Sequence, residues 1–448
     1  MTATIRLAGR PLGVIFGPML DPLPIVPFTG PARGAVILPG SKSITNRALL
    51  LAALGDRPVT ITNALFSRDT QLMIAALRAL GFTITADERA RVVHVAGRGG
   101  AIPAGEARID VGNAGTVARF LAAFVCLRPG GVYHFDGDEA MRRRPMGALL
   151  DALAAQGAQA TARAFPFTLR TAGLAGGDVT LDASESSQLV SALLLVAPHA
   201  RTPLRVHPGG KTVSRPFVAM TERMVAQFAA GPPAYAVEPD ATAASYFLAL
   251  PLVTGGRLAL PGFTIGPGLQ GDAQFAEVLR DVGLAVTGTD HPAGAEAGIP
   301  GGAPRRGVAA DFNAFSDTFL TLAAITPLLA GPTRIIGIAH TRRQETDRVA
   351  GAARELRKLG QHVDEQDDAL TITPDPGELR RRAAGGTIDI ETYDDHRFAM
   401  SFALLGCHDL RHDGTPWLRI RHPGCCAKTF PDFFAVLEQI RQNSLAPS

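Results

Sequence analysis

The sequence is poor in cysteine and in tryptophan, and neither sign of charge dominates it. Its 448 residues include four cysteines and one tryptophan, and 44 Lys and Arg against 41 Asp and Glu give a net charge of +3. So few cysteines in so long a chain exclude a disulfide framework. A nearly balanced charge is not typical of proteins that bind nucleic acids, so we expect no nucleic-acid partner.

Long apolar runs are also missing. No stretch of the sequence is long enough to cross a bilayer, and the N-terminal residues lack the charged and then apolar pattern of a signal peptide. We therefore expect no membrane partner and a cytoplasmic location. Several prolines and glycines near the start predict an irregular N-terminal extension over residues 1–30.

The cysteines could still be read as part of a metal site. Cys425 and Cys426 lie close to His422, and Cys407 directly precedes His408. Their spacings match none of the usual zinc patterns. We therefore expect no bound metal.

A chain of this length is too long for one ordinary core and suggests two large domains. A unit recurs six times along it: a strand-like run, a short polar or glycine turn, and an apolar helix of small residues. The turns begin at Pro39, Val111, Asp182, Glu238, Asp311 and Thr392. Amphipathic helices that end in glycine and lead into short strands lie between them, at 75–84, 150–159, 275–286 and 353–363.

These patterns predict an α/β protein with two domains, each built from three repeated units. We place the domain break near Glu238, so the first domain covers residues 41–238 and the second covers 31–40 together with 239–448. Equivalent turns in a pseudo-symmetric fold point the same way. Several helix N-termini that face one cleft would bind anions without a metal.

The first turn carries cations where a helix normally favours negative charge. Lys42 and Arg47 lie in the first turns of a helix that Ser41 would cap. An external anion would explain them, and a solvated basic turn is the alternative. The sequence has no Gly-x-x-x-x-Gly-Lys phosphate loop.

Other turns also carry groups suited to anions. The turn at 112–116 offers backbone N–H groups, residues 141–145 include three consecutive arginines, and residues 184–188 supply serines and a glutamine. Taken singly, each could be a solvated loop or a helix cap. Taken together, the cations at turn-to-helix junctions predict one cleft for two or more anionic groups, and they are Lys42, Arg47, Arg144, Arg348, Arg397 and Lys428.

Two carboxylates stand among these cations. Asp317 could be a helix cap, a general base or both, and the sequence alone leaves this open. Glu345 lies among arginines that keep it ionised unless a bound anion takes up their charge. No nucleotide-binding fingerprint or Ser-His-Asp order competes with an anion site.

The motifs and their order resemble the EPSP synthase family, the 3-phosphoshikimate 1-carboxyvinyltransferases, along nearly the whole chain after residue 30. The matching strings are Pro39-Gly-Ser-Lys-Ser with Asn46-Arg47, Gly112-Asn-Ala-Gly-Thr116, Arg144-Pro145, Ser186-Ser-Gln188, Ser214-Arg-Pro216, Asp317, Glu345-Thr-Asp-Arg348, Asp395-His-Arg397 and Ala427-Lys-Thr-Phe-Pro431. The resemblance implies an inside-out α/β barrel type of fold. Each domain would have three β-α-β-α-β-β units, with the active site in the interdomain cleft.

The resemblance also implies a reaction. The family transfers the enolpyruvyl group of phosphoenolpyruvate to the 5-hydroxyl of shikimate 3-phosphate and releases phosphate by addition and elimination. This is a step of the shikimate pathway, which leads to chorismate and the aromatic amino acids. We therefore expect these two small molecules as partners, no cofactor, and a monomeric enzyme.

The same resemblance implies roles for individual residues. Asp317, Glu345 and Lys42 would be catalytic, with Asp317 taking the proton of the acceptor hydroxyl and Glu345 protonating the methylene carbon and later removing a proton. Phosphoenolpyruvate would be held by Lys42, Asn113, Gly115, Thr116, Arg144, Gln188, Arg348, Arg397 and Lys428. The acceptor would be held by Ser43, Arg47, Ser186, Ser187, Gln188, Ser214, Asp317 and Gln344.

The departures from the family pattern concentrate on the acceptor side. Phe217 stands where a tyrosine is expected, and His340 and Gln344 stand where an asparagine and a lysine are expected. Phe120 replaces a residue that is often proline. Each lost contact to an acceptor anion would weaken binding by about 1–3 kcal/mol.

Three alternatives stay open at this point. A paralogous enolpyruvyl transferase could use a different hydroxylated acceptor. A transferase acting on a UDP-amino sugar usually has a cysteine in a mobile loop, whereas Cys126 lies in an apolar helical segment. A non-catalytic protein that binds anions or RNA phosphates on the same repeat would not need Lys42, Asp317 and Glu345 together.

Overall fold

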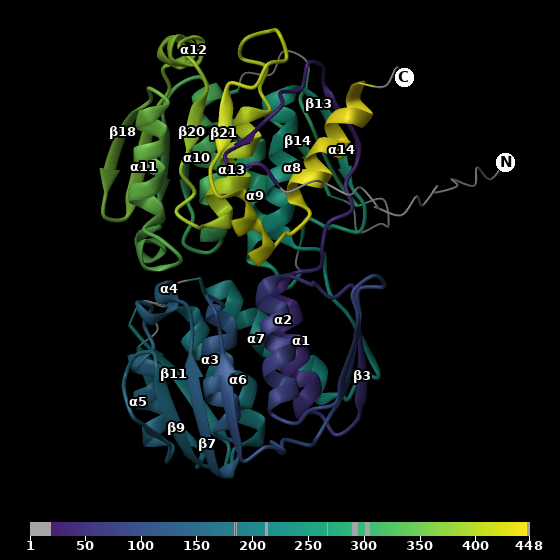
Figure 1. The fold of residues 1–448 in the computed structure, drawn as a ribbon, viewed down its shortest axis with the longest axis vertical. Coiled ribbons are helices and arrows are strands. Elements are labelled where there is room, and N and C mark those ends of the chain that lie inside the picture. The colour runs from purple at the N-terminus through teal and green to yellow at the C-terminus, as the bar shows by residue number, and fades with distance from the viewer. Residues whose placement is uncertain are drawn as a thin grey trace, which may run out of the picture.

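The computed structural model describes residues 19–182, 184, 186–210, 214–266, 268–288, 294–300 and 305–445. These residues form two α/β bodies, one below the other in Figure 1. The lower body holds most of the first half of the chain and the upper body most of the second half. Each body has its own cluster of buried hydrophobic residues.

Three sheets surround the core of the lower body. Their strands are β3 (Pro58–Thr62), β4 (Ile84–Asp87), β5 (Val92–Ala96), β6 (Glu106–Asp110), β7 (Pro129–Asp136), β8 (Gln159–Ala160), β9 (Phe167–Ala172), β10 (Gly177–Asp182), β11 (Leu204–Gly209) and β12 (Ala234–Ala236). The strand orders are β12-β3-β5-β4, β6-β7-β9-β8 and β10-β11. Strand β6 alternates exposed and buried residues, as expected for a strand with one face on the core.

Three helices fill the centre of the lower body, namely α1 (Lys42–Leu54), α3 (Gly115–Val125) and α6 (Ser187–Val196). They contact one another and are almost entirely buried, which fits helices that are apolar on every side. The remaining helices are α2 (Arg68–Ala79), α4 (Glu139–Arg142), α5 (Gly147–Ala155), α7 (Arg215–Ala229) and the short η1 (Ala197–His199).

The upper body repeats this plan. Its strands are β1 (Leu23–Pro24), β2 (Ala32–Ala35), β13 (Gly256–Leu260), β14 (Ala285–Thr287), β15 (Ala295–Gly298), β16 (Ala309–Asp311), β17 (Thr333–Ile336), β18 (His362–Gln366), β19 (Ala369–Thr373), β20 (Ile388–Ile390) and β21 (Leu418–Ile420). They form sheets in the orders β14-β15-β13-β2, β16-β17-β19-β18 and β1-β21-β20.

Three mutually contacting helices again lie at the centre, namely α8 (Ala241–Thr254), α10 (Phe319–Ile325) and α13 (His396–Gly406). The others are α9 (Phe275–Val282), α11 (Arg348–Lys358), α12 (Pro376–Ala384) and α14 (Phe433–Leu445), and the short η2 (Gly271–Gln274), η3 (Ser316–Thr318), η4 (Thr326–Leu328), η5 (Ala339–Arg343) and η6 (Pro423–Lys428). Buried helices inside and sheets outside, three sheets to a body in the described residues, confirm the predicted fold class.

The chain crosses between the bodies at two adjacent segments. The N–H of Ser41 donates to the carbonyl of Glu238 at 2.8 Å, and the N–H of Asp240 donates to the carbonyl of Pro39 at 2.9 Å. Strand β2 pairs in parallel with β13 and therefore belongs to an upper sheet. We propose that the domain boundary lies at these crossings, which divides the chain into 41–238 and 31–40 with 239–448.

The described part of the N-terminal segment packs against the upper body. Strand β1 pairs antiparallel with β21, and Ile25 and Phe28 are buried in the upper core. Apart from β1 and the bridge at Phe28, residues 19–30 form no helix or strand, and the irregular extension over 1–30 stays a prediction. Residues 1–18 lie outside the described residues.

Candidate active site

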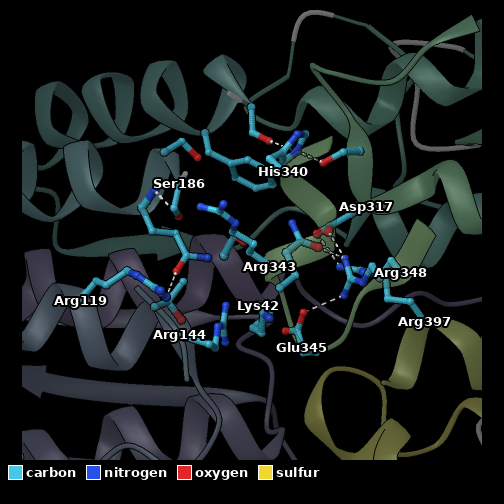
Figure 2. A pocket seen from close by; sticks show the side chains of 18 of the residues that line it. Lys42, Arg119, Arg144, Ser186, Asp317, His340, Arg343, Glu345, Arg348 and Arg397 are labelled. Atoms are coloured by element: carbon cyan, nitrogen blue, oxygen red, sulfur yellow. Dashed lines mark hydrogen bonds and ion pairs between the residues drawn. The ribbon is translucent and has the colours of Figure 1, made fainter. Parts of the chain in front are cut away.

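A pocket lies where the two bodies meet, and both contribute to its walls (Figure 2). The lower body supplies Lys42, Ser43, Arg47, Thr116, Arg119, Arg144, Pro145, Ser186, Ser187, Gln188, Ser214 and Phe217. The upper body supplies Ser316, Asp317, His340, Arg343, Gln344, Glu345, Arg348, His396 and Arg397. Arginine and lysine outnumber the carboxylates of Asp317 and Glu345 in this lining, so the pocket is strongly cationic.

Five of the six central helices begin at or beside this pocket, and α8 is the exception. Lys42 is the first residue of α1, Thr116 and Ser187 lie in the first turns of α3 and α6, and His396 is the first residue of α13. Asp317 lies in η3, directly before α10. Helix N-termini carry free N–H groups and positive potential. They therefore add to the attraction for anions, as the repeat predicted.

Arg348 joins three carboxylates at the centre of the upper wall. Its buried guanidinium contacts Asp395 (Nε to Oδ2, 2.7 Å), Asp317 (Nη1 to Oδ1, 3.0 Å) and Glu345 (Nη2 to Oε2, 2.9 Å). Burial lowers the pKa of Arg348, but the three carboxylates outweigh it and hold the pKa above its usual value. One fixed cation thus sets the positions of Asp317 and Glu345 relative to each other.

Asp317 lies between two arginines. Besides Arg348, it contacts Arg397, whose Nη2 lies 2.7 Å from Oδ2. Burial raises the pKa of Asp317, but the charges of Arg397 and Arg348 outweigh this and hold the pKa below its usual value. Asp317 is therefore ionised at neutral pH, which is the state that a general base needs.

Glu345 connects the two bodies through a lysine. The Nζ of Lys428 lies 3.0 Å from Oε1 of Glu345 and donates to the backbone carbonyl of Asn113, in the lower body, at 2.7 Å. Burial raises the pKa of Glu345, yet Lys428, Arg348 and Arg144 hold it well below its usual value. Glu345 is ionised as long as these cations face it.

Gly115 leaves room for two guanidinium groups. A Cβ at this position would lie 2.6 Å from Nη1 of Arg119, 2.7 Å from Nη2 of Arg144 and 2.8 Å from Oε1 of Gln188. Arg119 donates to that same Gln188 oxygen at 3.0 Å. The missing side chain therefore lets groups from three elements converge at the N-terminus of α3.

The side chain of Lys42 is paired within the lower body. Its Nζ lies 3.2 Å from Oδ2 of Asp69, which is buried, whereas its backbone N–H donates to Oδ2 of Asp240, in the upper body, at 3.3 Å. Asp69 was not predicted for the site. It orients the lysine toward the pocket while leaving further N–H donors for a ligand.

Arg47 is held by the protein itself. It donates to Oγ1 of Thr221 at 2.8 Å, Oγ of Ser191 at 3.2 Å and the carbonyls of Ser43 and Phe217 at 3.1 and 3.3 Å. Burial lowers the pKa of its guanidinium to about 9. The guanidinium also lies 4.9 Å from the ring centroid of Phe120. Phe120, which stands where the family often has a proline, therefore packs against this arginine.

His340 spans the two bodies. Its Nε2 lies 2.8 Å from Oγ of Ser316 in the upper body and 3.3 Å from Oγ of Ser214 in the lower body. Figure 2 labels His340 and marks its hydrogen bonds with dashed lines. Ser214 has the left-handed backbone conformation, with a φ of 50°, directly before α7. His340 thus ties a predicted acceptor residue to the opposite wall.

Most of the predicted site residues line the pocket. Asn113, Gly115 and Lys428 do not, but each contacts a residue that does, namely Arg144, Arg119 and Glu345. Seven lining residues were not among the predicted site residues: Arg119, Pro145, Phe217, Ser316, His340, Arg343 and His396. Phe217 and His340 had been noted only as departures from the family pattern on the acceptor side. The other five lie within, beside or one helical turn from a motif that was recognised, so proximity to those motifs is the signal that could have found them.

The structure offers no support for a metal centre or a membrane segment in the ranges that it describes. No group of three or more His, Cys, Asp or Glu side chains there could hold a metal ion, and the four cysteines are unpaired. No helix within those ranges has the length and apolarity needed to cross a membrane.

The fold and the pocket define a class of protein: a two-domain α/β protein with a strongly cationic pocket between its domains and two carboxylates in the wall of that pocket. A family model described as EPSP synthase (3-phosphoshikimate 1-carboxyvinyltransferase) matches residues 28–437. The chain belongs to this family.

Individual relatives agree with the family match. A 3-phosphoshikimate 1-carboxyvinyltransferase of Opitutus terrae is 54% identical and covers 96% of this chain and 100% of its own length. A 3-phosphoshikimate 1-carboxyvinyltransferase of Nostoc punctiforme is 39% identical and covers 94% of this chain and 100% of its own length. Among solved structures, EPSP synthase of Acinetobacter baumannii has a TM-score of 0.73 at 23% identity and covers 93% and 97%. The structure of the enolpyruvyl transferase NikO of Streptomyces tendae shares the fold, with a TM-score of 0.65 at 19% identity. It covers 93% of this chain and 96% of its own.

Proposed function

We propose that this enzyme transfers the enolpyruvyl group of phosphoenolpyruvate to the 5-hydroxyl of shikimate 3-phosphate and releases phosphate. The observation that carries this proposal is the placement of Asp317 and Glu345 on one buried arginine, Arg348, in a cationic pocket between two domains. Addition followed by elimination needs two proton-transfer groups and a site for two anions.

The donor is held by the ionic part of the pocket. Its phosphate and carboxylate bind Lys42, Arg144, Arg348, Arg397 and Lys428, and the N-terminus of α3, from Asn113 to Thr116, lies beside the phosphate with Gln188. Support comes from the convergence of Arg119, Arg144 and Gln188 on the space beside Gly115. A guanidinium and free N–H groups bind a phosphate with charge-assisted hydrogen bonds.

The acceptor is held by the hydroxyl-rich part. Ser43, Arg47, Ser186, Ser187, Gln188, Ser214 and Gln344 line the wall that would surround it. Asp317 faces the same pocket and, because it is ionised, accepts the proton of the acceptor's 5-hydroxyl.

The reaction then proceeds in two stages. In the addition, the acceptor oxygen bonds to C2 of phosphoenolpyruvate while Glu345, in its protonated form, gives a proton to the C3 methylene. In the elimination, the bond between C2 and the phosphate oxygen breaks, phosphate leaves, and Glu345 takes a proton back from C3. Lys42 stabilises the charge that develops on the departing phosphate.

The protonated form of Glu345 depends on the donor. Lys428 and Arg348 keep Glu345 ionised in the structure as it stands. The phosphate and carboxylate of the donor would draw these cations to themselves and so raise the pKa of Glu345. Donor binding thus prepares the acid for the addition step, and closure of the two domains would exclude water.

We further propose a monomer that works in the cytoplasm without a nucleic-acid partner. One chain supplies both walls of the pocket, which supports a monomer. Four unpaired cysteines, three of them buried, fit a reducing compartment.

Phosphate release from phosphoenolpyruvate, with and without shikimate 3-phosphate, tests the proposed reaction. We expect release that depends on the acceptor, with a turnover of about 1 per second or faster. Phe217, His340 and Gln344 support a second candidate, a transferase with another hydroxylated acceptor. Donor binding without turnover on shikimate 3-phosphate, and turnover on a different acceptor, would favour that candidate.

A further inference from the structure

The proposed acceptor has two anionic groups, but its predicted binding residues include only one cation. Shikimate 3-phosphate carries a carboxylate and a phosphate, whereas Arg47 is the single arginine or lysine among the predicted acceptor residues. Binding two separated anions normally requires charge-assisted hydrogen bonds to each. The inference below rests on the proposed function and asks which residue supplies the second cation.

Arg47 cannot serve both groups. Four hydrogen bonds to Thr221, Ser191 and the carbonyls of Ser43 and Phe217 fix its guanidinium in one place. A guanidinium has five N–H donors, so little capacity is left for a ligand. Arg47 therefore accounts for one anionic group at most.

Gln344 does not fill the gap either. The family pattern leads us to expect a lysine here, but the side chain is uncharged and its Oε1 accepts a hydrogen bond from Nη1 of Arg348. Arg348 is in turn buried among Asp317, Glu345 and Asp395. Position 344 thus lacks the expected positive charge, and the side chain of Gln344 is hydrogen-bonded to Arg348 in the ionic part of the pocket.

The residue before it is a cation that lines the same pocket. Arg343 is the last residue of η5 and its side chain is exposed, so a solute can reach it. Figure 2 shows it in the middle of the pocket, between Ser186 on one side and Asp317 on the other. It projects from the upper body, whereas Ser186, Ser187 and Ser214 belong to the lower one.

We propose that Arg343 binds the phosphate of the acceptor from the upper domain, opposite Ser186, Ser187 and Ser214, and so determines acceptor specificity. A planar guanidinium and serine hydroxyls suit the three oxygens of a phosphate. Ser186 also caps α6, whose N-terminus adds positive potential on that side. Arg343, one position before the lysine expected at 344, would thus supply the positive charge that Gln344 lacks.

Arg343→Gln tests this assignment by steady-state kinetics. We expect the KM for shikimate 3-phosphate to rise about 10- to 100-fold and the KM for phosphoenolpyruvate to change less than about twofold. Arg342→Gln is the matched control, because it removes the same charge from the adjacent residue, whose guanidinium pairs with Asp347 and Glu365 and does not line the pocket. We expect both kinetic constants of that variant to stay close to wild type.

Binding of shikimate, which lacks the phosphate, shows whether Arg343 binds that phosphate or only contributes to the overall positive charge of the pocket. If Arg343 binds the phosphate, Arg343→Gln weakens binding of shikimate 3-phosphate in calorimetry and leaves weak binding of shikimate unchanged. Adding Gln344→Lys to Arg343→Gln should recover at least part of the lost affinity. Equal losses for both ligands, or an unchanged KM for shikimate 3-phosphate, would overturn the assignment.

The proposed function is tested separately by the wild-type enzyme. If wild type releases no phosphate with shikimate 3-phosphate, the proposed acceptor is wrong. If wild type turns over and Arg343→Gln behaves like wild type, the acceptor stands and the role of Arg343 is wrong.

Discussion

The two ends of the pocket are built on different principles. The ionic end consists of Lys42, Arg144, Arg348 and Arg397 with Asp317 and Glu345, together with Lys428, which contacts Glu345 without lining the pocket. Most of these cations already contact a carboxylate of the protein. The hydroxyl end consists of Ser43, Ser186, Ser187 and Ser214 with Arg47, Phe217, His340, Arg343 and Gln344. There, Arg47 donates to backbone carbonyls, and His340 is hydrogen-bonded to the hydroxyls of Ser214 and Ser316.

This difference explains where the sequence departs from its family. In a buried ionic network, removal of one partner leaves an unpaired charge, which costs about 3–5 kcal/mol. The ionic end therefore tolerates little change, and it retains every residue that the family pattern leads us to expect. At the hydroxyl end, one substitution removes about one neutral hydrogen bond, which costs less than an unpaired buried charge. Phe217 in place of tyrosine and Gln344 in place of lysine are therefore tolerated there. We therefore propose that reaction chemistry depends mainly on the ionic end and acceptor specificity mainly on the hydroxyl end.

Glu345→Gln tests the ionic end with the largest expected effect. The amide cannot protonate the methylene carbon, so we expect turnover to fall about 10²- to 10⁴-fold. Binding of phosphoenolpyruvate should stay the same or tighten, because Lys428 and Arg348 lose a competing carboxylate. Phosphate release and calorimetry measure the two quantities.

The control for this variant is Glu365→Gln. Glu365 pairs with Arg342 and Arg357 and does not line the pocket, so the same loss of charge should leave turnover unchanged. Loss of donor binding in Glu345→Gln with normal turnover would show that Glu345 binds the donor and transfers no proton.

The ionic end also shows how far sequence reasoning reaches. Motifs predicted the repeated α/β fold, the pocket and its cations, because cations at helix N-termini stand out in a sequence. The partners of those cations were not predicted. Asp69 neutralises Lys42 from helix α2, and nothing in the sequence links the two. Pairings of this kind depend on how the helices pack, which one sequence does not reveal.

The same limit applied at the hydroxyl end. Phe120 stood out only as a replacement for a residue that is often proline, whereas it packs against the guanidinium of Arg47. His340 looked like a lost asparagine, whereas it joins Ser214 to Ser316 across the two domains. Each substitution acquired a new contact that only the three-dimensional arrangement supplies.

Gly115→Ala tests whether the ionic end depends on exact spacing. The added Cβ would lie within 2.8 Å of the ends of Arg119, Arg144 and Gln188, which must move. We expect the KM for phosphoenolpyruvate to rise about 10- to 100-fold. The KM for the acceptor should change less than about threefold, because the acceptor is bound chiefly by other residues.

Gly30→Ala is the matched control, since nothing lies within 4 Å of a Cβ at that position. The atoms that a Cβ at 115 would meet are the ends of long side chains, so the melting temperature of Gly115→Ala should stay close to wild type. An unchanged KM for the donor would show that the donor does not occupy the space beside Gly115.

Phe217→Tyr tests the hydroxyl end by restoring the side chain that the family pattern predicts. The new hydroxyl would reach the pocket and add one hydrogen bond to an acceptor anion. We expect the KM for shikimate 3-phosphate to fall about three- to tenfold at an unchanged KM for the donor. A lower KM for the donor instead would place the donor, and not the acceptor, beside Phe217.

Proton uptake on binding of phosphoenolpyruvate is the smallest of the expected effects. Measured with the donor and with the acceptor, it compares the ionic end with the hydroxyl end. Glu345 is ionised because Lys428, Arg348 and Arg144 face it. A bound phosphate and carboxylate compete for these cations, so the pKa of Glu345 should rise on donor binding. Uptake should then be a fraction of one proton and larger at acidic than at alkaline pH, and it is measured by calorimetry in buffers of different ionisation enthalpy.

The donor's own phosphate loses protons when cations bind it, so the informative quantity is the difference between wild type and Glu345→Gln. We expect wild type to take up more protons than the variant on binding phosphoenolpyruvate, and the two to agree on binding shikimate 3-phosphate. Equal uptake with the donor would mean that the cations do not release Glu345, and the acid of the addition step would have to be sought elsewhere. A difference that appears with the acceptor instead would mean that the two ends of the pocket are coupled through Arg348, which contacts both Glu345 and Gln344.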